Sequence, residues 1–162
     1  MSIIDECLVH NEEFARNFEG PMPLVPQRHL AVVACMDSRI DVFACLGLHL
    51  GEAHVIRNAG GVVTDDILRS LAISQHKLQT REIIVIHHTE CGLQTFTDDE
   101  FKGELEARTG ERPTWEEKCF VDVDESVRES VSNLKSSPFL VDVEHIRGFV
   151  FEVGTGRLRE VS

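Results

Sequence analysis

The sequence LAVVACMDSR at residues 30–39 begins with an apolar run and continues into reactive and charged side chains. The run from Leu30 to Ala34 shows no alternation of apolar and polar residues, so it predicts a strand buried on both faces. Two similar runs follow, AHVI at residues 53–56 and IIVI at residues 83–86. Three such runs in succession indicate neighbouring strands inside one sheet.

A helical pattern lies between the second and third runs, where apolar residues from Ile67 to Leu78 recur on one helix face. Strand, helix and strand in this order predict a parallel sheet. We therefore expect an α/β fold with a mainly parallel sheet of about four to five strands, flanked by helices. The chain is expected to form a single domain over residues 1–162, with a catalytic α/β core over residues 28–95.

The remaining segments are expected to flank that core. Residues 3–19 have helical spacing of apolar side chains, with Ser2 as a candidate cap. Residues 122–161 predict a helix followed by a strand hairpin. Residues 97–118 are acidic and only weakly periodic, and they receive no functional assignment.

Composition excludes several classes of function. The chain has 162 residues, with 16 Lys and Arg against 28 Asp and Glu, for a net charge of −12. A chain this acidic is a poor partner for nucleic acid or for an anionic membrane surface. It contains no apolar run near the roughly 20 residues of a membrane span. The first residues have no basic n-region and soon turn acidic, unlike a signal peptide, so a cytoplasmic location is expected.

Five cysteines need an explanation. Five is odd, and a chain of this length can build a core without disulfides, so buried, metal-binding or catalytic thiols are expected. For Cys7, Cys45 and Cys119 we expect packing roles. Cys35 and Cys91 differ because each follows a predicted strand end.

These two cysteines and a histidine form a candidate metal site. The spacing His88-x-x-Cys91 lets one turn offer an imidazole and a thiolate to the same ion, and Cys35 can add a second thiolate from a neighbouring strand. Two sulfurs and one nitrogen suit zinc, and three protein ligands leave the fourth position of a catalytic site open. Asp37 and Arg39 follow Cys35 at two-residue intervals and can form an activating pair. The backbone N–H of Gly92 is a candidate donor to a developing oxyanion.

Each of these motifs alone has an ordinary structural explanation. A cysteine at a strand end is usually core, and an Asp–Arg pair is usually a surface contact. The sequence RNAGG at residues 57–61 indicates either an anion cradle or a tight turn between strand and helix. Strand alternation should turn His87 away from the metal. The joint occurrence of the motifs at strand ends favours the catalytic interpretation.

Three motifs in order resemble the β-class carbonic anhydrases: Cys35-x-Asp37-Ser38-Arg39, Arg57-Asn58-Ala59-Gly60 and His88-x-x-Cys91-Gly92. The resemblance covers roughly residues 28–95 and is greatest to the short actinobacterial-type members. Related carbon disulfide hydrolases share the scaffold.

The resemblance implies one Zn²⁺ per subunit, bound by Cys35, His88 and Cys91, with Asp37 and Arg39 as the catalytic dyad. It implies a lyase that hydrates carbon dioxide reversibly to bicarbonate and a proton through zinc-bound hydroxide. Gly60 and Gly92 are expected to border the substrate. A homodimer or a dimer of dimers is expected, with the N-terminal helix packed on a neighbouring subunit.

Two alternatives remain open at this point. The apolar Met36 and Leu93 beside the motifs leave room for CS₂ or COS as substrate. A non-catalytic zinc or redox-thiol module is the second alternative. Candidate groups to carry the product proton away are His54, His87 and Glu90.

Overall fold

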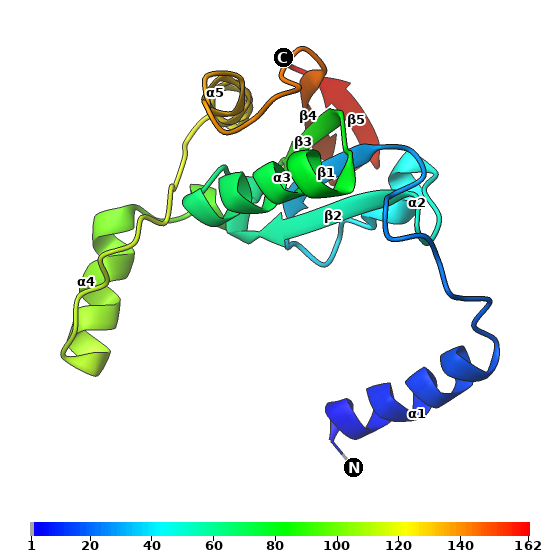
Figure 1. Cartoon of the computed structure of the whole chain (residues 1–162). Coiled ribbons are helices and arrows are strands. Elements are labelled where there is room, and N and C mark those ends of the chain that lie inside the picture. The colour runs from blue at the N-terminus through cyan, green and yellow to red at the C-terminus, as the bar shows by residue number, and fades with distance from the viewer. Residues whose placement is uncertain (1) are drawn as a thin grey trace.

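A five-stranded sheet forms the centre of the molecule, with the strand order β2-β1-β3-β4-β5 (Figure 1). The structure is a computed structural model that describes residues 2–162. The first four strands are parallel and the fifth returns antiparallel; their bounds are β1 (Leu30–Cys35), β2 (Ala53–Asn58), β3 (Glu82–His88), β4 (Ile146–Glu152) and β5 (Arg157–Glu160). The predicted α/β class and the C-terminal hairpin are confirmed.

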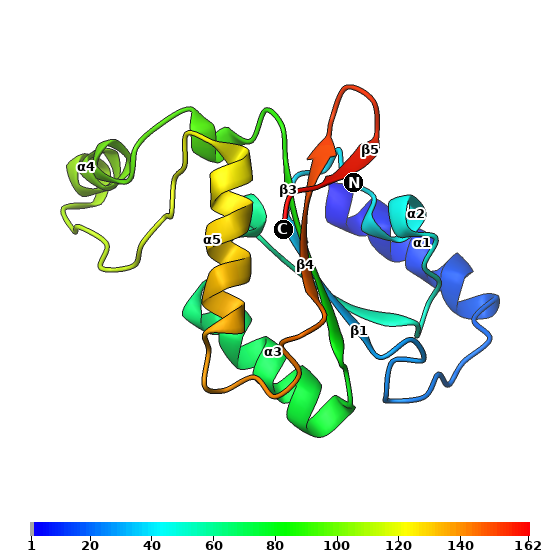
Figure 2. The same ribbon diagram turned by 90° about the horizontal axis from the view of Figure 1, so that it is seen from above.

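Helices lie on both faces of this sheet (Figure 2). On one face, α3 (Asp65–Leu78) and α5 (Val123–Lys135) cover the sheet, and α2 (Val42–Leu46) lies on the other face. Both of the longer helices are capped, since Thr64 accepts a hydrogen bond from the first turn of α3 and Asp122 does so for α5. These hydrogen bonds satisfy backbone donors that a helix leaves free at its start.

The side chains on the two faces of β1 belong to two separate hydrophobic cores. Ala31 and Val33 pack toward α3 and α5, whereas Val32 and Ala34 pack toward the α2 side together with Cys35. All of these side chains are buried, as expected for a strand covered on both faces. The second core also contains Cys91, so the candidate metal ligands are built into the packed interior.

The N-terminal helix α1 (Ile3–Arg16) stands away from the sheet (Figure 1). None of its residues is buried, and its large apolar side chains are exposed within this chain: Ile3, Ile4, Leu8, Val9 and Phe14. The expectation of a packed Cys7 is therefore wrong for the single chain, because the apolar side of α1 has no partner in it. Ser2 caps α1 as predicted, in a capping box with Asp5.

A second projection follows β3. It consists of α4 (Asp98–Thr109) and a segment without helix or strand, residues 111–121, which we call the strap. The strap runs back along α4 toward α5 (Figure 1). Aromatic contacts hold the two together, with ring centroids 6.3 Å apart between Phe101 and Trp115. Asp98 also accepts a hydrogen bond from the backbone N–H of Cys119 at 2.8 Å.

Among the residues described, no helix combines the length and the apolar character needed to cross a membrane.

Candidate metal centre

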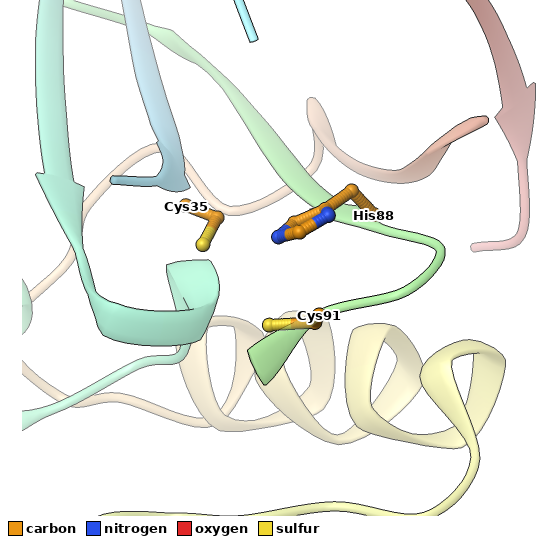
Figure 3. Close-up of side chains that lie close together, drawn as sticks. All are labelled: Cys35, His88 and Cys91. Carbon is orange, nitrogen blue, oxygen red and sulfur yellow. The ribbon is translucent and has the colours of Figure 1, made fainter. Parts of the chain in front are cut away.

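Three side chains, two at the ends of neighbouring strands and one in the turn after the second strand, meet at one end of the sheet (Figure 3). Cys35 is the last residue of β1, His88 is the last residue of β3, and Cys91 follows in the next turn. Because β1 and β3 are adjacent and parallel, their ends place these residues side by side. Their ligand atoms all lie within 4.8 Å of one another, and all three residues are buried. The structure thus brings the predicted ligands together.

The imidazole of His88 is oriented for a metal ion. Its Nδ1 lies 2.9 Å from the carbonyl oxygen of Thr89, which fixes Nδ1 as the donor and leaves the lone pair on Nε2. Nε2 is buried and has no hydrogen-bond partner among the described residues. A buried acceptor without a partner is costly, and a metal ion would satisfy it. Two sulfurs and one nitrogen fit zinc, so the residues fit the group that the sequence predicts.

The two thiols influence each other's ionisation in the metal-free centre. The neighbouring Cys91 lowers the pKa of Cys35, and the neighbouring Cys35, together with burial, raises the pKa of Cys91. Burial opposes protonation of His88, but the adjacent Cys35 and Asp37 outweigh it and raise the pKa of His88. A cation that binds here displaces these protons, because ligand thiols bind metal as thiolates.

Asp37 and Arg39 form the predicted pair at the edge of this centre. Arg39 donates from Nε to Oδ1 of Asp37 at 2.9 Å and from Nη2 to Oδ2 at 2.8 Å. These hydrogen bonds hold the pKa of Asp37 well below its usual range. Oδ2 of Asp37 also lies 3.7 Å from Nε2 of His88. An ionised carboxylate is therefore fixed beside the ligand cluster.

Glu90 helps to hold Arg39. Its backbone carbonyl accepts from Nη2 of Arg39 at 3.0 Å, and its carboxylate lies 3.4 Å from Nη1. Glu90 has φ +57°, the left-handed region that few side chains adopt. The turn between His88 and Cys91 thus keeps a carbonyl aimed at the guanidinium.

Arg57 has a role that the sequence pattern did not specify. Its Nε donates to the carbonyl of Cys35 at 2.9 Å and its Nη2 to the carbonyl of Asp37 at 2.6 Å. The guanidinium therefore fastens the backbone on both sides of Met36. The motif that suggested an anion cradle thus uses its arginine to hold the loop that follows β1. Register could have indicated this, because Arg57 pairs with Ala34 across the sheet.

The turn after β2 packs its backbone directly against the backbone of β1 and β3, and glycine makes this possible. A Cβ at Gly61, which has φ +70°, would lie 2.7 Å from the carbonyl oxygen of Ile86 and 2.8 Å from the nitrogen of Cys35. Glycine is required there because these contacts are with backbone atoms. His87 also contacts this turn, because its Nε2 lies 3.0 Å from the carbonyl oxygen of Gly61.

His87 points away from the metal ligands, as strand alternation predicted. Its ring stacks on Phe120 with centroids 5.7 Å apart, and burial lowers its pKa to about 4. It is therefore neutral at physiological pH. Of the other candidates for proton transfer, His54 is tied through Nδ1 to Ser74 at 2.7 Å, and Glu90 contacts Arg39.

A cavity of about 550 Å³ opens over the metal ligands. Gly60 and Gly92 line it, and a Cβ at Gly92 would meet no atom within 4 Å. The inner wall is otherwise largely apolar and includes Met36 and Leu93. The structure adds an outer wall from Phe96, which precedes α4, and from α4 and the strap, which sequence patterns left unassigned: Phe101, Trp115, Glu116 and Glu117.

Known proteins are similar to this chain in sequence and in structure. The family model described as carbonic anhydrase matches residues 30–115. The chain is 53% identical over 162 residues to β-carbonic anhydrase 1 of Mycobacterium tuberculosis, covering 100% of this chain and 99% of that protein. It is 36% identical to a carbon disulfide hydrolase of Acidithiobacillus thiooxidans, covering 91% of this chain and 88% of that protein.

A solved structure agrees with these sequence relatives. The crystal structure of carbonic anhydrase from Streptococcus mutans superposes with a TM-score of 0.93 at 44% identity, covering 100% of this chain and 99% of that chain. Similarity of this extent includes the strands that carry the three ligands and the segments before and after them. The chain belongs to the β-carbonic anhydrase family.

Proposed function

We propose that this chain catalyses the reversible hydration of carbon dioxide to bicarbonate and a proton, with one zinc ion per subunit. The observation that carries the proposal is the buried set of Cys35, His88 and Cys91 with an ionised Asp37 beside it. Three protein ligands leave a fourth position for a reactant, which distinguishes a catalytic zinc site from a structural one.

Cys35, His88 and Cys91 would hold the zinc ion through two sulfurs and Nε2. When bound, zinc supplies a Lewis acid that makes water a better nucleophile near neutral pH. The buried ligand set limits the freedom of the ion, and the contact from His88 to Thr89 fixes the ring that faces it.

Asp37 orients the attacking water in this proposal. Oδ1 already accepts from both the backbone N–H and Nε of Arg39, whereas Oδ2 accepts from Nη2 and can take a second hydrogen bond. The remaining lone pairs near His88 can orient the hydrogen of an attacking water. Arg39 keeps the carboxylate ionised and prevents it from rotating away.

The cavity walls suit a small apolar substrate. Carbon dioxide carries no charge, so the apolar surface of Leu93 and Met36 can receive it while the charged dyad stays on one side. The N–H groups near Gly60 and Gly92 are candidate donors to the oxygens that gain charge during attack. These two glycines remain proposed substrate contacts.

Carbon disulfide hydrolysis is the alternative on the same site. The apolar residue Met36 is 66% exposed at the cavity and would tolerate a sulfur substrate. Greater identity to a β-carbonic anhydrase than to a carbon disulfide hydrolase supports carbon dioxide instead. A non-catalytic zinc or thiol module is disfavoured by the dyad, because a structural site has no use for it.

We also infer that the chain acts as one domain within a homodimer. One sheet carries both cores, and α1 presents an uncovered apolar face. A second copy would cover that face. A cytoplasmic location is supported by five cysteines without a disulfide, because secreted domains usually oxidise such thiols.

The test is a stopped-flow assay of carbon dioxide hydration on zinc-loaded protein at pH 7 and pH 9. The proposal predicts a rate above that of Cys35→Ala at one or both pH values. Sulfide release from CS₂ is measured on the same samples. Equal rates for the wild type and Cys35→Ala at both pH values would refute the carbon dioxide proposal.

A further inference from the structure

Glu117 is a buried carboxylate in the wall of the active-site cavity. Its side chain is 3% exposed, and neither of its oxygens has a hydrogen-bond partner among the described residues. Nζ of Lys102 lies 3.6 Å from Oε2, close enough for an ion pair. Buried carboxylates usually have their hydrogen bonds satisfied, so this one has unused capacity to accept a proton or a water.

The titratable groups of the cavity lining divide into two sets. Cys35, Asp37, His88 and Cys91 belong to the metal centre and its dyad, and the other two are Glu116 and Glu117. Glu116 is 71% exposed and lies 3.4 Å from Nζ of Lys118. The strap therefore carries an inner carboxylate and an outer carboxylate in consecutive positions.

Hydration of carbon dioxide releases a proton that a pair of carboxylates such as Glu117 and Glu116 could carry. Carbon dioxide and water give bicarbonate and one proton, and this proton must leave an otherwise largely apolar cavity. Asp37 is a poor acceptor because Arg39 donates to both of its oxygens and holds its pKa low. His87 faces away from the ligands, and its Nε2 is engaged by Gly61.

We propose that Glu117 takes up the proton released by hydration and passes it to Glu116 at the rim of the cavity, an inference that rests on the proposed function. In the first step an O–H bond forms on Glu117 and its negative charge is neutralised. In the second step that O–H bond breaks, and Glu116 carries the proton to solvent. Glu117 returns to the carboxylate beside Lys102, so the cycle closes without another reactant.

The experiment compares Glu117→Gln with the wild type in stopped-flow hydration at low and high concentrations of imidazole. The steps up to bicarbonate release precede proton transfer, so kcat/KM stays within about twofold of the wild type. At low imidazole, kcat falls at least roughly tenfold, as expected when a proton acceptor is lost. High imidazole restores kcat because the small buffer accepts the proton directly.

Two further variants separate proton transfer from a structural effect. Glu104→Gln removes an exposed carboxylate of α4 that does not line the cavity, and its kcat matches the wild type. Glu117→Asp keeps a proton acceptor and retains part of kcat at low imidazole. A structural role for the Lys102–Glu117 pair would instead lower kcat/KM and the midpoint of thermal unfolding, without rescue by imidazole.

A readout that needs no turnover completes the test. Infrared difference spectra of the metal-free protein between acidic and neutral pH contain a carboxyl band that Glu117→Gln loses and Glu104→Gln retains. Unchanged kcat in Glu117→Gln at low imidazole, with an active wild type, would overturn the proton-transfer role of Glu117 and leave the proposed function standing. An inactive zinc-loaded wild type would overturn the proposed function, and the inference with it.

Discussion

Arg39 donates to both carboxylate oxygens of Asp37, at 2.9 Å and 2.8 Å, and the same guanidinium donates to the backbone carbonyl of Glu90. Asp37 follows β1, whereas Glu90 lies in the turn after β3. Arg39 therefore joins the two segments that supply the metal ligands. Its contacts set the position of the ionised carboxylate of Asp37 beside His88.

Arg39→Lys tests this planar contact. A lysine keeps the charge but cannot form two parallel hydrogen bonds with a carboxylate. We expect carbon dioxide hydration to fall roughly a hundredfold, which is the effect of losing one preorganised electrostatic contact, while zinc content stays near one per chain. Arg69→Lys on the surface of α3, where Arg69 pairs with Asp66, is the matched control and should keep full activity. Equal activity in both variants would contradict the role of the dyad.

Gly61→Ala tests the close backbone approach beneath the metal centre. Gly61 and Gly110 both have positive φ, at +70° and +80°, but a Cβ at Gly110 would meet no atom within 4 Å. Gly110→Ala should cost about 1 kcal/mol of unfolding free energy from backbone strain alone. Gly61→Ala should cost at least about 3 kcal/mol, because the clash with Ile86 and Cys35 adds to the strain.

Urea unfolding of the two metal-free variants measures this difference. Similar losses for both would show that backbone strain alone, and not the contact with Cys35, determines the need for glycine at position 61.

His87→Gln tests the pH dependence of stability. Burial lowers the pKa of His87 from 6.5 to about 4, so the unfolded chain binds more protons than the folded chain between these values. Stability is therefore complete above about pH 6.5 and falls with decreasing pH through this window, by about 3 kcal/mol relative to a variant without the imidazole. Glutamine can still donate to the carbonyl of Gly61.

The measurement is urea unfolding of metal-free wild type, His87→Gln and His145→Gln at several pH values from 4 to 7. His145 is exposed, so its replacement should leave the pH slope unchanged. A slope in His87→Gln equal to that of the wild type would show that His87 is charged in the folded protein.

Leu8→Asp tests the proposed dimer through α1. Leu8 is 60% exposed on a helix without buried residues, so a charge there does little to the single chain. A central apolar contact between subunits would be lost, and the dimer dissociation constant should rise roughly thirtyfold or more. Sedimentation equilibrium measures this, with Val141→Asp at another exposed position as the control. A monomeric wild type would contradict the proposal.

The sheet and the metal centre were predictable because both depend on local patterns. The apolar runs at Leu30 and Ile83 mark buried strands, and parallel strand ends bring Cys35 and His88 together. The position of Cys7 was not predictable, because an amphipathic helix shows which side is apolar but not which chain covers it. Glu117 was missed for a different reason. Its burial comes from packing of the strap on α4, and residues 97–118 have little apolar periodicity.

The most direct test of the account is a zinc titration of the metal-free protein followed by stopped-flow carbon dioxide hydration at each point. The account predicts a rate that rises linearly to one zinc per chain and then stays constant, while Cys91→Ser binds no zinc tightly and shows only the uncatalysed rate. A rate that is independent of zinc, or a zinc-loaded wild type at the uncatalysed rate, would contradict the claim that Cys35, His88 and Cys91 form a catalytic zinc centre.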